Sequence, residues 1–277
     1  MLLYHYCSNE AFFGIVGSRR IRLSPLGLSN DAREGHHALD VAQRLLPIGS
    51  PTRNTIRDDL AESISRHQVL GFCLSEAGDL LSQWRGYADD AQGVAIGFDH
   101  EEFLALIEGE NLQLQKVAYT KLSLAKKMKP RLRQISAHDM KLFTLGRIAI
   151  GGNYVKTPEE DARYIKWKEE QDELYCELAK LAYAFKSKFF EEEQEWRVYT
   201  MIPCANGVIS IPNVQFLPSA QLMKPFLSFP QDGFANSLIK EVILGPRNRT
   251  PPDMARLFLN SYKFDHVQIA QSAGTYR

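Results

Sequence analysis

The segment Glu192-Glu193-Gln194-Glu195-Trp196-Arg197-Val198-Tyr199 combines acidic, basic and apolar residues at a two-residue spacing. In a strand, side chains two residues apart point to the same face, so Glu193, Glu195 and Arg197 should lie together while the residues between them pack behind. A carboxylate pair fixed beside an apolar strand can act in catalysis or stabilise a developing positive charge. The alternative interpretations are a solvated charge run and a salt-bridged edge.

A second candidate is the histidine in Tyr4-His5-Tyr6 near the start of the chain. Alternation along a strand places His5 on the face opposite to both tyrosines. A single histidine on a strand is more often structural than catalytic, so this position alone does not establish a site.

A third candidate is Gln83-Trp84-Arg85-Gly86-Tyr87, followed by Ala88-Asp89-Asp90. The pattern predicts a helix on which Trp84 and Tyr87 lie one turn apart, whereas Arg85 projects to a different side and can reach an anion. Asn30, Asp31 and Glu34 form a further polar group in a loop, where such residues are typical of a turn or a helix cap.

Composition excludes several classes of protein. The chain has 277 residues, of which 44% are hydrophobic and 24% charged, and its 33 basic residues balance 33 acidic ones, so no global field attracts nucleic acid or an anionic membrane. The four cysteines lack the spacing of a zinc site, and we expect no metal. No signal peptide or membrane-spanning stretch is recognisable, so we expect a cytoplasmic protein.

The remaining pattern predicts an α+β fold with a mixed or antiparallel β core, flanking helices and a long helical insert. We expect one domain over residues 1–277, with the insert at about 121–190 formed by two long helices, the second beginning at Thr157-Pro158. The C-terminal Tyr276-Arg277 is expected to pack against the body of the protein. Strands are expected at 2–7, 20–23, 69–74, 93–98, 195–201, 208–211, 239–244 and 267–269, and shorter helices at 9–16, 56–64, 80–87, 101–107 and after 252.

Several of these segments together resemble DUF2971, a bacterial family of unknown function whose members look like components of defence or accessory gene clusters. The resemblance spans nearly the whole chain but implies little chemistry. It rests on Tyr4-His5-Tyr6, Leu81-Ser82-Gln83-Trp84-Arg85-Gly86-Tyr87-Ala88-Asp89, Gly93-Val94-Ala95-Ile96-Gly97-Phe98-Asp99, Glu193-Gln194-Glu195-Trp196-Arg197 and Ser272-Ala273-Gly274-Thr275-Tyr276-Arg277.

A weaker resemblance, to ADP-ribosyltransferase-like domains, does imply chemistry. Those domains combine a first-strand His or Arg, a middle aromatic or Ser element and a late Glu, and this chain offers His5, then Ser24 or Tyr87, then Glu195. Glu193-x-Glu195 is similar to the Glu-x-Glu of arginine-modifying members. The chain departs from the pattern because Pro25 follows the serine and the tyrosine is predicted on a helix.

The resemblance implies a role for each of these residues toward NAD as substrate. His5, beside Tyr4, would hold a ribose hydroxyl, and Tyr87 would stack on nicotinamide. Arg85 or Arg197 would meet the pyrophosphate. Glu195, paired with Glu193, would stabilise the oxocarbenium character that builds when the nicotinamide–ribose bond breaks.

The function expected from the sequence is therefore a defence-associated, nucleotide-handling protein that resembles an NAD-dependent ADP-ribosyltransferase or NAD glycohydrolase. Its expected partners are a nucleotide substrate, a protein or nucleic-acid acceptor and a neutralising or sensor partner, with no membrane. One alternative is a metal-dependent nuclease that uses Asp31, Glu34, Asp89 and Asp90 together with the glutamate pair. Another is a noncatalytic sensor of a nucleotide or a phage protein.

Overall fold

The computed structural model describes residues 1–28, 37–45, 52–145, 158–205, 208–209, 213–218 and 223–276. Its fold is α+β, as expected, with a mixed sheet in which only β10 and β11 are parallel to each other among the described pairs. The strands are β1 (Leu2–Cys7), β2 (Ile21–Pro25), β3 (His67–Ser75), β4 (Val94–Asp99), β5 (Gln113–Lys116), β6 (Glu195–Ala205), β7 (Val208–Ile209), β8 (Gln215–Pro218), β9 (Met223–Phe229), β10 (Ile239–Leu244) and β11 (Gln268–Gln271).

The sheet divides along one edge of β3. On one side β3 pairs with β6 over its full length, from His67 to Ser75. On the other side it pairs with β2 at Leu70 and Gly71 and with β1 only at Ser75. In the described part of the sheet, residues 72–74 of β3 therefore have no strand partner on this edge, and β1 and β2 diverge there. Unpaired backbone groups at such a division need side-chain partners or solvent.

Apolar side chains between the sheet and three amphipathic helices form the first core. The helices are α1 (Asn9–Ser18), α5 (His100–Ile107) and α8 (Pro252–Ser261), and Phe98, Phe103 and Phe234 lie in the centre of this core. Asp99 caps α5, because its side chain accepts hydrogen bonds from the backbone N–H groups of Glu101 and Glu102.

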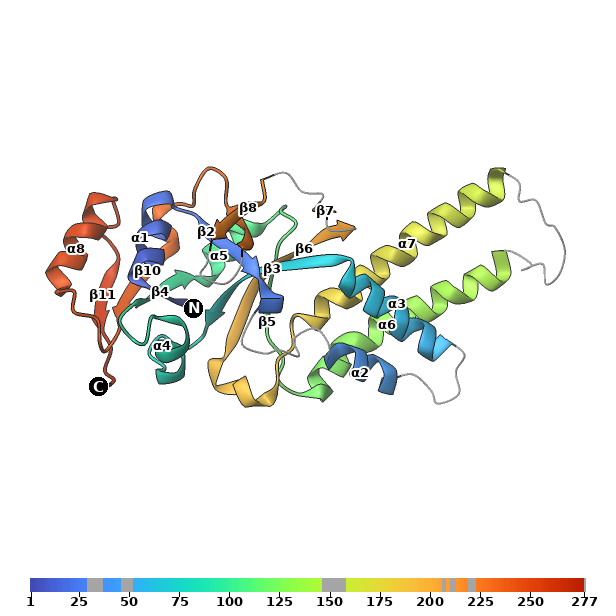
Figure 1. The fold of residues 1–277 in the computed structure, drawn as a ribbon, viewed down its shortest axis with the longest axis horizontal. Helices are drawn as coiled ribbons and strands as arrows, with labels where there is room; N and C mark the ends of the chain where they lie inside the picture. The colour runs from blue at the N-terminus through green and yellow to red at the C-terminus, as the bar shows by residue number, and fades with distance from the viewer. Residues whose placement is uncertain are drawn as a thin grey trace.

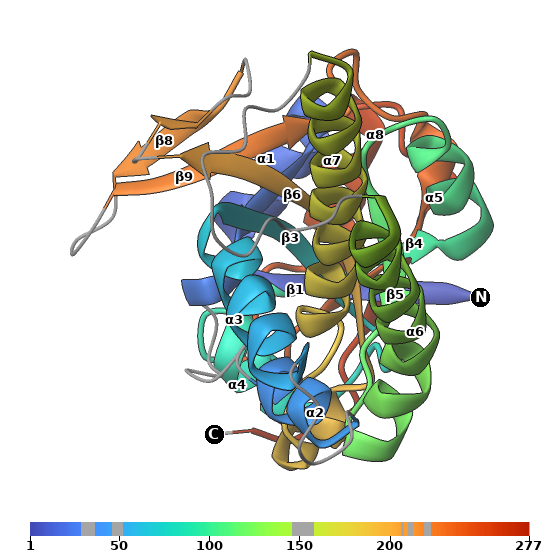
Figure 2. The same ribbon diagram turned by 90° about the vertical axis from the view of Figure 1, so that its right-hand side faces the viewer.

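A second core joins four helices at the other end of the molecule. These are α2 (His37–Leu45), α3 (Thr52–Ser65), α6 (Lys121–Leu145) and α7 (Pro158–Ala182). The two long helices expected in the insert are therefore present. We call α6 and α7 the helical arm, because they run side by side away from the sheet (Figures 1 and 2). Helices α2 and α3, which precede the insert in the sequence, pack against its base.

Several local expectations were wrong. Glu193 does not share a strand with Glu195, because it ends a short 3-10 helix, η2 (Lys188–Glu193), and Gln194 then adopts a left-handed φ of 44° before β6 begins. Before α4 (Leu81–Tyr87), the hydroxyl of Ser75 donates to the carbonyl of Glu193 and accepts from the N–H of Ala77. Strands β5, β8 and β9 were not predicted.

The C-terminal segment packs against α4 and the turn after it, as predicted for Tyr276. Its hydroxyl donates to Asp90 Oδ1 at 2.8 Å, and its ring lies 5.8 Å from the guanidinium carbon of Arg85 and 5.6 Å from that of Arg247. Arg277 is outside the described residues. In the described ranges, no helix combines the length and apolar character that a bilayer crossing requires.

Candidate functional site

A cleft opens where β1 and β2 diverge. It has a volume of about 540 Å³ and is lined by α1, β2, the unpaired edge of β3 and the β8–β9 hairpin. This volume lies within the range of small-molecule and cofactor sites. His5, Ser24, Cys73 and Tyr87 all line it, so three of the residues predicted from sequence, His5, Ser24 and Tyr87, meet here from distant parts of the chain.

The outer wall of the cleft is positively charged. Arg20 directly precedes β2, Arg22 lies near its start and Lys224 comes from β9. Among the described residues, no acidic side chain lines the cleft. β2 pairs with β9 in antiparallel register, so the Arg22 side chain lies over the Phe226 ring, with 5.2 Å between the guanidinium carbon and the ring centroid. These cations were missed from sequence. Their placement is suited to phosphate groups.

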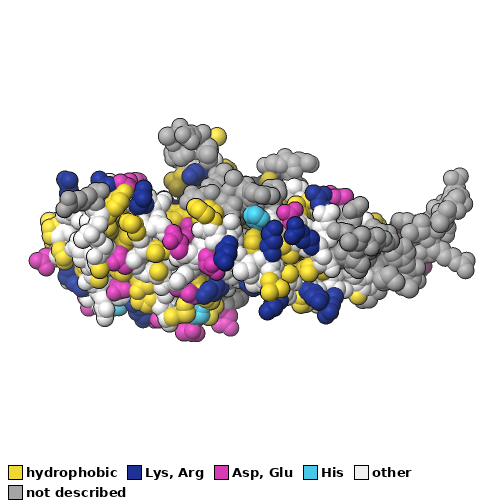
Figure 3. All heavy atoms as spheres, turned by 90° about the horizontal axis from the view of Figure 1, so that it is seen from below, with side chains coloured by type: hydrophobic (Ala, Val, Ile, Leu, Met, Phe, Trp, Pro, Cys, Tyr) yellow, Lys and Arg dark blue, Asp and Glu magenta, His cyan; other side chains and the backbone are white. Residues whose placement is uncertain are grey.

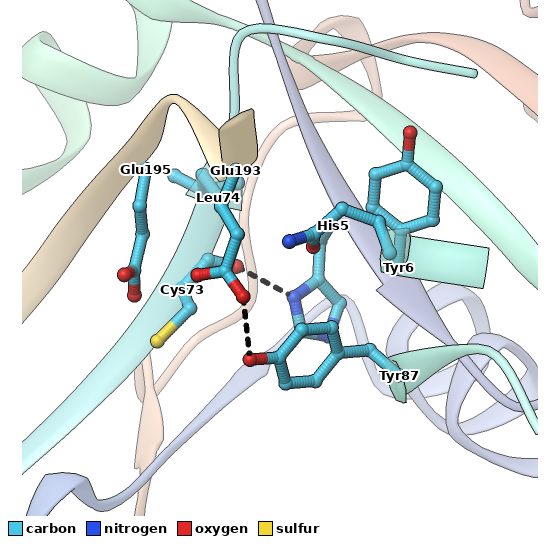
Figure 4. A pocket seen from close by; sticks show the side chains of 8 residues that line it. His5, Tyr6, Cys73, Leu74, Tyr87, Glu193 and Glu195 are labelled. Atoms are coloured by element: carbon cyan, nitrogen blue, oxygen red, sulfur yellow. Dashed lines mark hydrogen bonds between the residues drawn. The ribbon is translucent and has the colours of Figure 1, made fainter. Parts of the chain in front are cut away.

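A smaller pocket of about 40 Å³ continues inward from the cleft. The two cavities share His5, Cys73 and Tyr87, and the inner one adds Gln83, Glu193 and Glu195, as well as Tyr6 and Leu74. Figure 4 shows the Glu193 carboxylate pointing toward Tyr87, with the His5 ring beside them and Glu195 on the other side, near Cys73. The inner pocket has room for a water or a hydroxyl group but not for an aromatic ring.

Both glutamates belong to a buried charge cluster, formed by Lys186, Glu193, Glu195 and Arg197, whose exposed fractions are at most 7%. Lys186 Nζ lies 2.6 Å from Glu193 Oε2 and 3.3 Å from Glu195 Oε2. Arg197 donates from Nε and Nη2 to the two oxygens of Glu195, at 2.7 and 2.9 Å, and from Nη1 to the carbonyl of Tyr183. Lys186 was not identified from sequence.

The two carboxyl groups are electrostatically different. Burial raises the pKa of Glu195, but Arg197 and then Lys186 outweigh burial and lower this pKa to about 2. For Glu193 burial dominates and raises the pKa, although Lys186 and the Tyr87 hydroxyl, which donates to Oε1 at 3.2 Å, favour the ionised form. Glu195 is therefore a fixed anion held by two cations, whereas Glu193 is the more basic carboxylate and faces Tyr87.

His5 is neutral in this site. Burial lowers its pKa to about 4, although the hydrogen bond to Cys73 acts in the opposite direction. Its Nδ1 lies 2.8 Å from the carbonyl oxygen of Cys73, and a carbonyl only accepts, so Nδ1 carries the proton and Nε2 is left as an acceptor. The ring stacks on Phe72 at 4.0 Å between centroids. His5 thus satisfies a carbonyl on the unpaired edge of β3 while its other nitrogen remains available for bonding.

Three other residues proposed from sequence line neither cavity. Tyr4 lies on the opposite face of β1 from His5, as predicted, and donates to Glu241 at 2.7 Å. Arg85 is exposed over the Tyr276 ring. Arg197 is completely buried on Glu195. Arg85 and Arg197 therefore do not lie where a ligand in the cleft could reach them. The cations of the outer wall are placed to contact phosphate in their stead.

Of the carboxylates considered for a nuclease besides the glutamate pair, the two that the structure describes lie away from this site. Asp89 and Asp90 line neither cavity, and Asp90 pairs with Arg247 and Tyr276. Asp31 and Glu34 lie outside the described residues. Within the described part of the chain, no group of three or more His, Cys, Asp or Glu side chains is placed to hold a metal ion.

Comparison with known proteins finds a match to one family and indicates no activity. The model of a family described as "Protein of unknown function (DUF2971)" matches residues 83–198, which begin at Gln83 in α4 and end at Val198 in β6. The match includes Tyr87 and the whole charge cluster, and it supports the resemblance to DUF2971 over fewer than half of the 277 residues, not over nearly the whole chain. No curated protein and no solved structure matches the chain significantly.

Proposed function

We propose that this protein, of which residues 83–198 match the DUF2971 family, binds NAD in the cleft and cleaves its nicotinamide–ribose bond. The observation that carries the proposal is that His5, Tyr87 and Glu193 converge at the inner pocket, next to a cleft whose described charged residues are all cationic. The neutral imidazole, the phenol and the carboxylate suit a ribose and an aromatic ring, and the cations suit a pyrophosphate. The defence role and the cytoplasmic location expected from sequence remain predictions.

The volumes of the two cavities indicate which part of NAD each of them would hold. The 40 Å³ pocket is too small for nicotinamide, so the ring and its ribose lie in the larger cleft beside Tyr87, and only a hydroxyl group or a water enters the inner pocket. Arg20 and Arg22, with Lys224 across from them, then lie on the side of the cleft that would receive the two phosphates. A pyrophosphate carries two charges that these side chains can neutralise.

The proposed reaction breaks the bond between ribose C1′ and the nicotinamide nitrogen. The bonding electron pair leaves with the ring, which becomes neutral nicotinamide, and positive charge builds on the ribose. The Glu193 carboxylate stabilises this charge and takes the proton that an incoming water or acceptor hydroxyl releases as it bonds to C1′.

The other residues of the site hold this arrangement. His5 accepts a hydrogen bond from a ribose hydroxyl through Nε2, since a group with a pKa of about 4 is a weak base at neutral pH. Glu195, with both oxygens bound by Arg197, positions Lys186, and Lys186 in turn positions Glu193. We therefore assign the reacting carboxylate to Glu193 and a positioning role to Glu195.

The test is release of free nicotinamide from NAD, measured by mass spectrometry with and without cell extract. We expect Glu193→Gln to lower the rate at least about 100-fold, which is the usual contribution of a positioned acid–base group. Glu192→Gln is the matched control, because it makes the same change on the adjacent, exposed residue and should retain the full rate.

Circular dichroism and thermal melting of each variant exclude loss of folding as the cause of a lost rate. Equal rates for the two variants, or no nicotinamide release by the unmodified protein in either condition, would contradict the proposal. NAD binding without release would instead favour the sensor function.

A further inference from the structure

The first part of α6 has an unusual charge composition. Between residues 121 and 138 it contains basic residues and no acidic one, although the whole chain is electrically balanced. The cations are Lys121, Lys126, Lys127, Lys129, Arg131 and Arg133. Such a segment can form a local basic surface on a protein with no net charge. The overall composition does not reveal it.

These cations are not neutralised by neighbouring carboxylates. Among the described side chains none of the six takes part in an ion pair; Lys127 donates to the carbonyl of Lys116, and Arg131 donates to Gln134. Lys121, Lys126, Lys129 and Arg133 are exposed. Lysines that maintain a solvated helix surface usually alternate with acids, and here they do not.

Three of the cations form a continuous row, which we call the basic strip: Lys126, Lys129 and Arg133. Their spacing of three and then four residues places them on one face of the helix. The opposite face is fixed in the second core by Leu124, Met128, Leu132 and Ile135, which are at most 3% exposed. The strip is therefore held rigidly toward solvent and extends about 10 Å along the helix axis.

The neighbouring helix of the arm has the opposite character. The sequence of α7 contains eight acidic and four basic residues. Lys168 of α7 pairs with Asp172, and Lys180 pairs with Glu177. Figure 3 shows Lys and Arg side chains gathered over the part of the molecule where the arm leaves the sheet. Positive charge is thus concentrated on α6 rather than spread over the whole arm.

We propose that the basic strip of α6 binds the phosphate backbone of a nucleic acid. A nucleic-acid strand advances about 3.4 Å per nucleotide, so a strip of about 10 Å faces roughly three phosphates with three cations. An anionic membrane fits less well, since membrane-surface helices place an apolar face beside their cations, and the apolar face of α6 is buried in the protein. Leu122 is the exposed apolar exception.

The inference does not depend on NAD chemistry, because the strip lines neither the cleft nor the inner pocket. The two surfaces are nevertheless linked through the chain. Tyr119, two residues before α6 begins, accepts a hydrogen bond at its hydroxyl from the backbone N–H of Glu195 at 2.7 Å. If both proposals hold, the base of the arm brings a nucleic acid toward the side of the molecule that carries the charge cluster.

Fluorescence anisotropy with labelled single-stranded and duplex DNA of about 30 nucleotides tests the proposal, without NAD, between about 50 and 200 mM salt. The test variant is Lys126→Gln/Lys129→Gln/Arg133→Gln. The matched control, Arg163→Gln/Lys166→Gln/Lys168→Gln, removes the same number of exposed cations from α7. We expect the unmodified protein to bind with a strong salt dependence. The α6 variant should lower the slope of log K against log salt by about 2–3, and the α7 variant should leave it unchanged.

Three results would overturn the proposal. One is absence of DNA binding by the unmodified protein at the lowest salt concentration. Another is an equal loss of binding in the α7 control, which would show a diffuse charge effect instead of a site. The third is binding to phosphatidylserine vesicles that is tighter than binding to DNA and is lost in the α6 variant. Helical circular dichroism of both variants confirms that the arm remains folded.

Discussion

Lys186 links the two glutamates of the site, and Arg197 makes them differ. Lys186 is 1% exposed, lies between Glu193 and Glu195, and contacts the Phe190 ring at 4.6 Å. Burial lowers its pKa, but the neighbouring glutamates outweigh burial and raise it, so Lys186 stays charged. Because Arg197 already holds Glu195 in a two-pronged hydrogen bond, Glu193 is the carboxylate left to face the pocket. Arg197 thus fixes Glu195, and Glu193 is the carboxylate to which we assign the proposed reaction.

The structural role assigned to Glu195 predicts a large effect on stability. Glu195→Gln would leave the buried Arg197 guanidinium without its anionic partner, which typically costs about 3–5 kcal/mol. We expect the free energy of unfolding, measured by urea titration, to fall by that amount. Glu192→Gln, on the exposed surface, should change it by less than about 0.5 kcal/mol. Equal stabilities of the two variants would contradict the role assigned to Glu195.

The lowered pKa of His5 predicts a pH dependence of stability. As the pH falls, the unfolded chain takes up a proton near pH 6.5, whereas the folded protein does not until about pH 4. Stability is therefore lost across this window, by up to about 3 kcal/mol. His5→Phe retains the stacking on Phe72 and lacks the titration. The stability difference between the unmodified protein and this variant should change between pH 7 and pH 4, and parallel pH profiles would exclude the assignment.

Residue type and spacing were enough to predict some residues of the candidate site but not its cations. Glu193, Tyr87 and His5 were found because a paired acid, an aromatic residue on a helix and a strand histidine are chemically unusual. Lys186 was missed because a single lysine after a helix has no distinctive spacing. Arg20 and Lys224 were missed because their proximity depends on the pairing of β2 with β9, and β9 itself was not predicted.

At the scale of elements, α4 connects the tail to the pocket. Tyr87 of α4 faces Glu193, and Arg85 of α4 lies against Tyr276. The helix ends in three consecutive residues with left-handed φ, Asp89 at 50°, Asp90 at 48° and Ala91 at 67°. Such residues carry a conformational cost and persist when neighbours hold them. Here Arg247 and Tyr276 both bind Asp90, so the tail supports the turn that sets the position of Tyr87.

Removal of residues 273–277 should therefore lower stability. The truncation deletes the Tyr276–Asp90 hydrogen bond, the hydrogen bond from Ala273 N–H to Asp79 and the contacts of the Tyr276 ring with Arg85 and Arg247. Together these predict a loss of about 2 kcal/mol, which corresponds to a melting temperature lower by roughly 5 °C. Tyr276→Phe, which removes only the hydroxyl, should have a smaller effect. An unchanged melting temperature after truncation would contradict this account of the tail.

Two glycines, Gly93 and Gly86, should respond in opposite ways to substitution by alanine, because only Gly93 lies close to the backbone of β1. A Cβ on Gly93 would lie 2.0 Å from the backbone oxygen of Cys7, so Gly93→Ala must displace the backbone and should destabilise the protein strongly, by more than about 3 kcal/mol. A Cβ on Gly86, in the exposed part of α4, meets nothing within 4 Å, so Gly86→Ala should stabilise by up to about 1 kcal/mol. Urea titration of the two variants measures the difference, and effects of equal sign would refute it.

Some strands could be predicted from the sequence and others could not. The buried strands β1, β3, β4 and β10 are apolar runs with clear ends, and their positions agree with prediction to within about two residues. Strands β8 and β9 are partly exposed, contain prolines and have little apolar periodicity, so only pairing with β2 and with each other defines them. Edge strands of this kind are specified by tertiary pairing rather than by local pattern.

At the scale of the whole molecule, the division of the sheet and the helical arm create two separate surfaces. The divergence of β1 and β2 opens the cleft, because β3 lacks a partner between them. The second core holds α6 so that its basic strip faces solvent. Neither surface follows from total composition, since equal numbers of acidic and basic residues conceal both the cationic wall of the cleft and the strip.

The central claim is that the cationic wall and the inner carboxylate form one nucleotide site, and calorimetric titration of NAD tests it most directly. We expect NAD to bind the unmodified protein, and Arg20→Gln/Arg22→Gln to weaken the affinity at least about 10-fold through loss of phosphate contacts. Lys166→Gln/Lys168→Gln, which removes two exposed cations from α7, should leave the affinity unchanged. No detectable NAD binding, or equal affinities for all three proteins, would contradict the account.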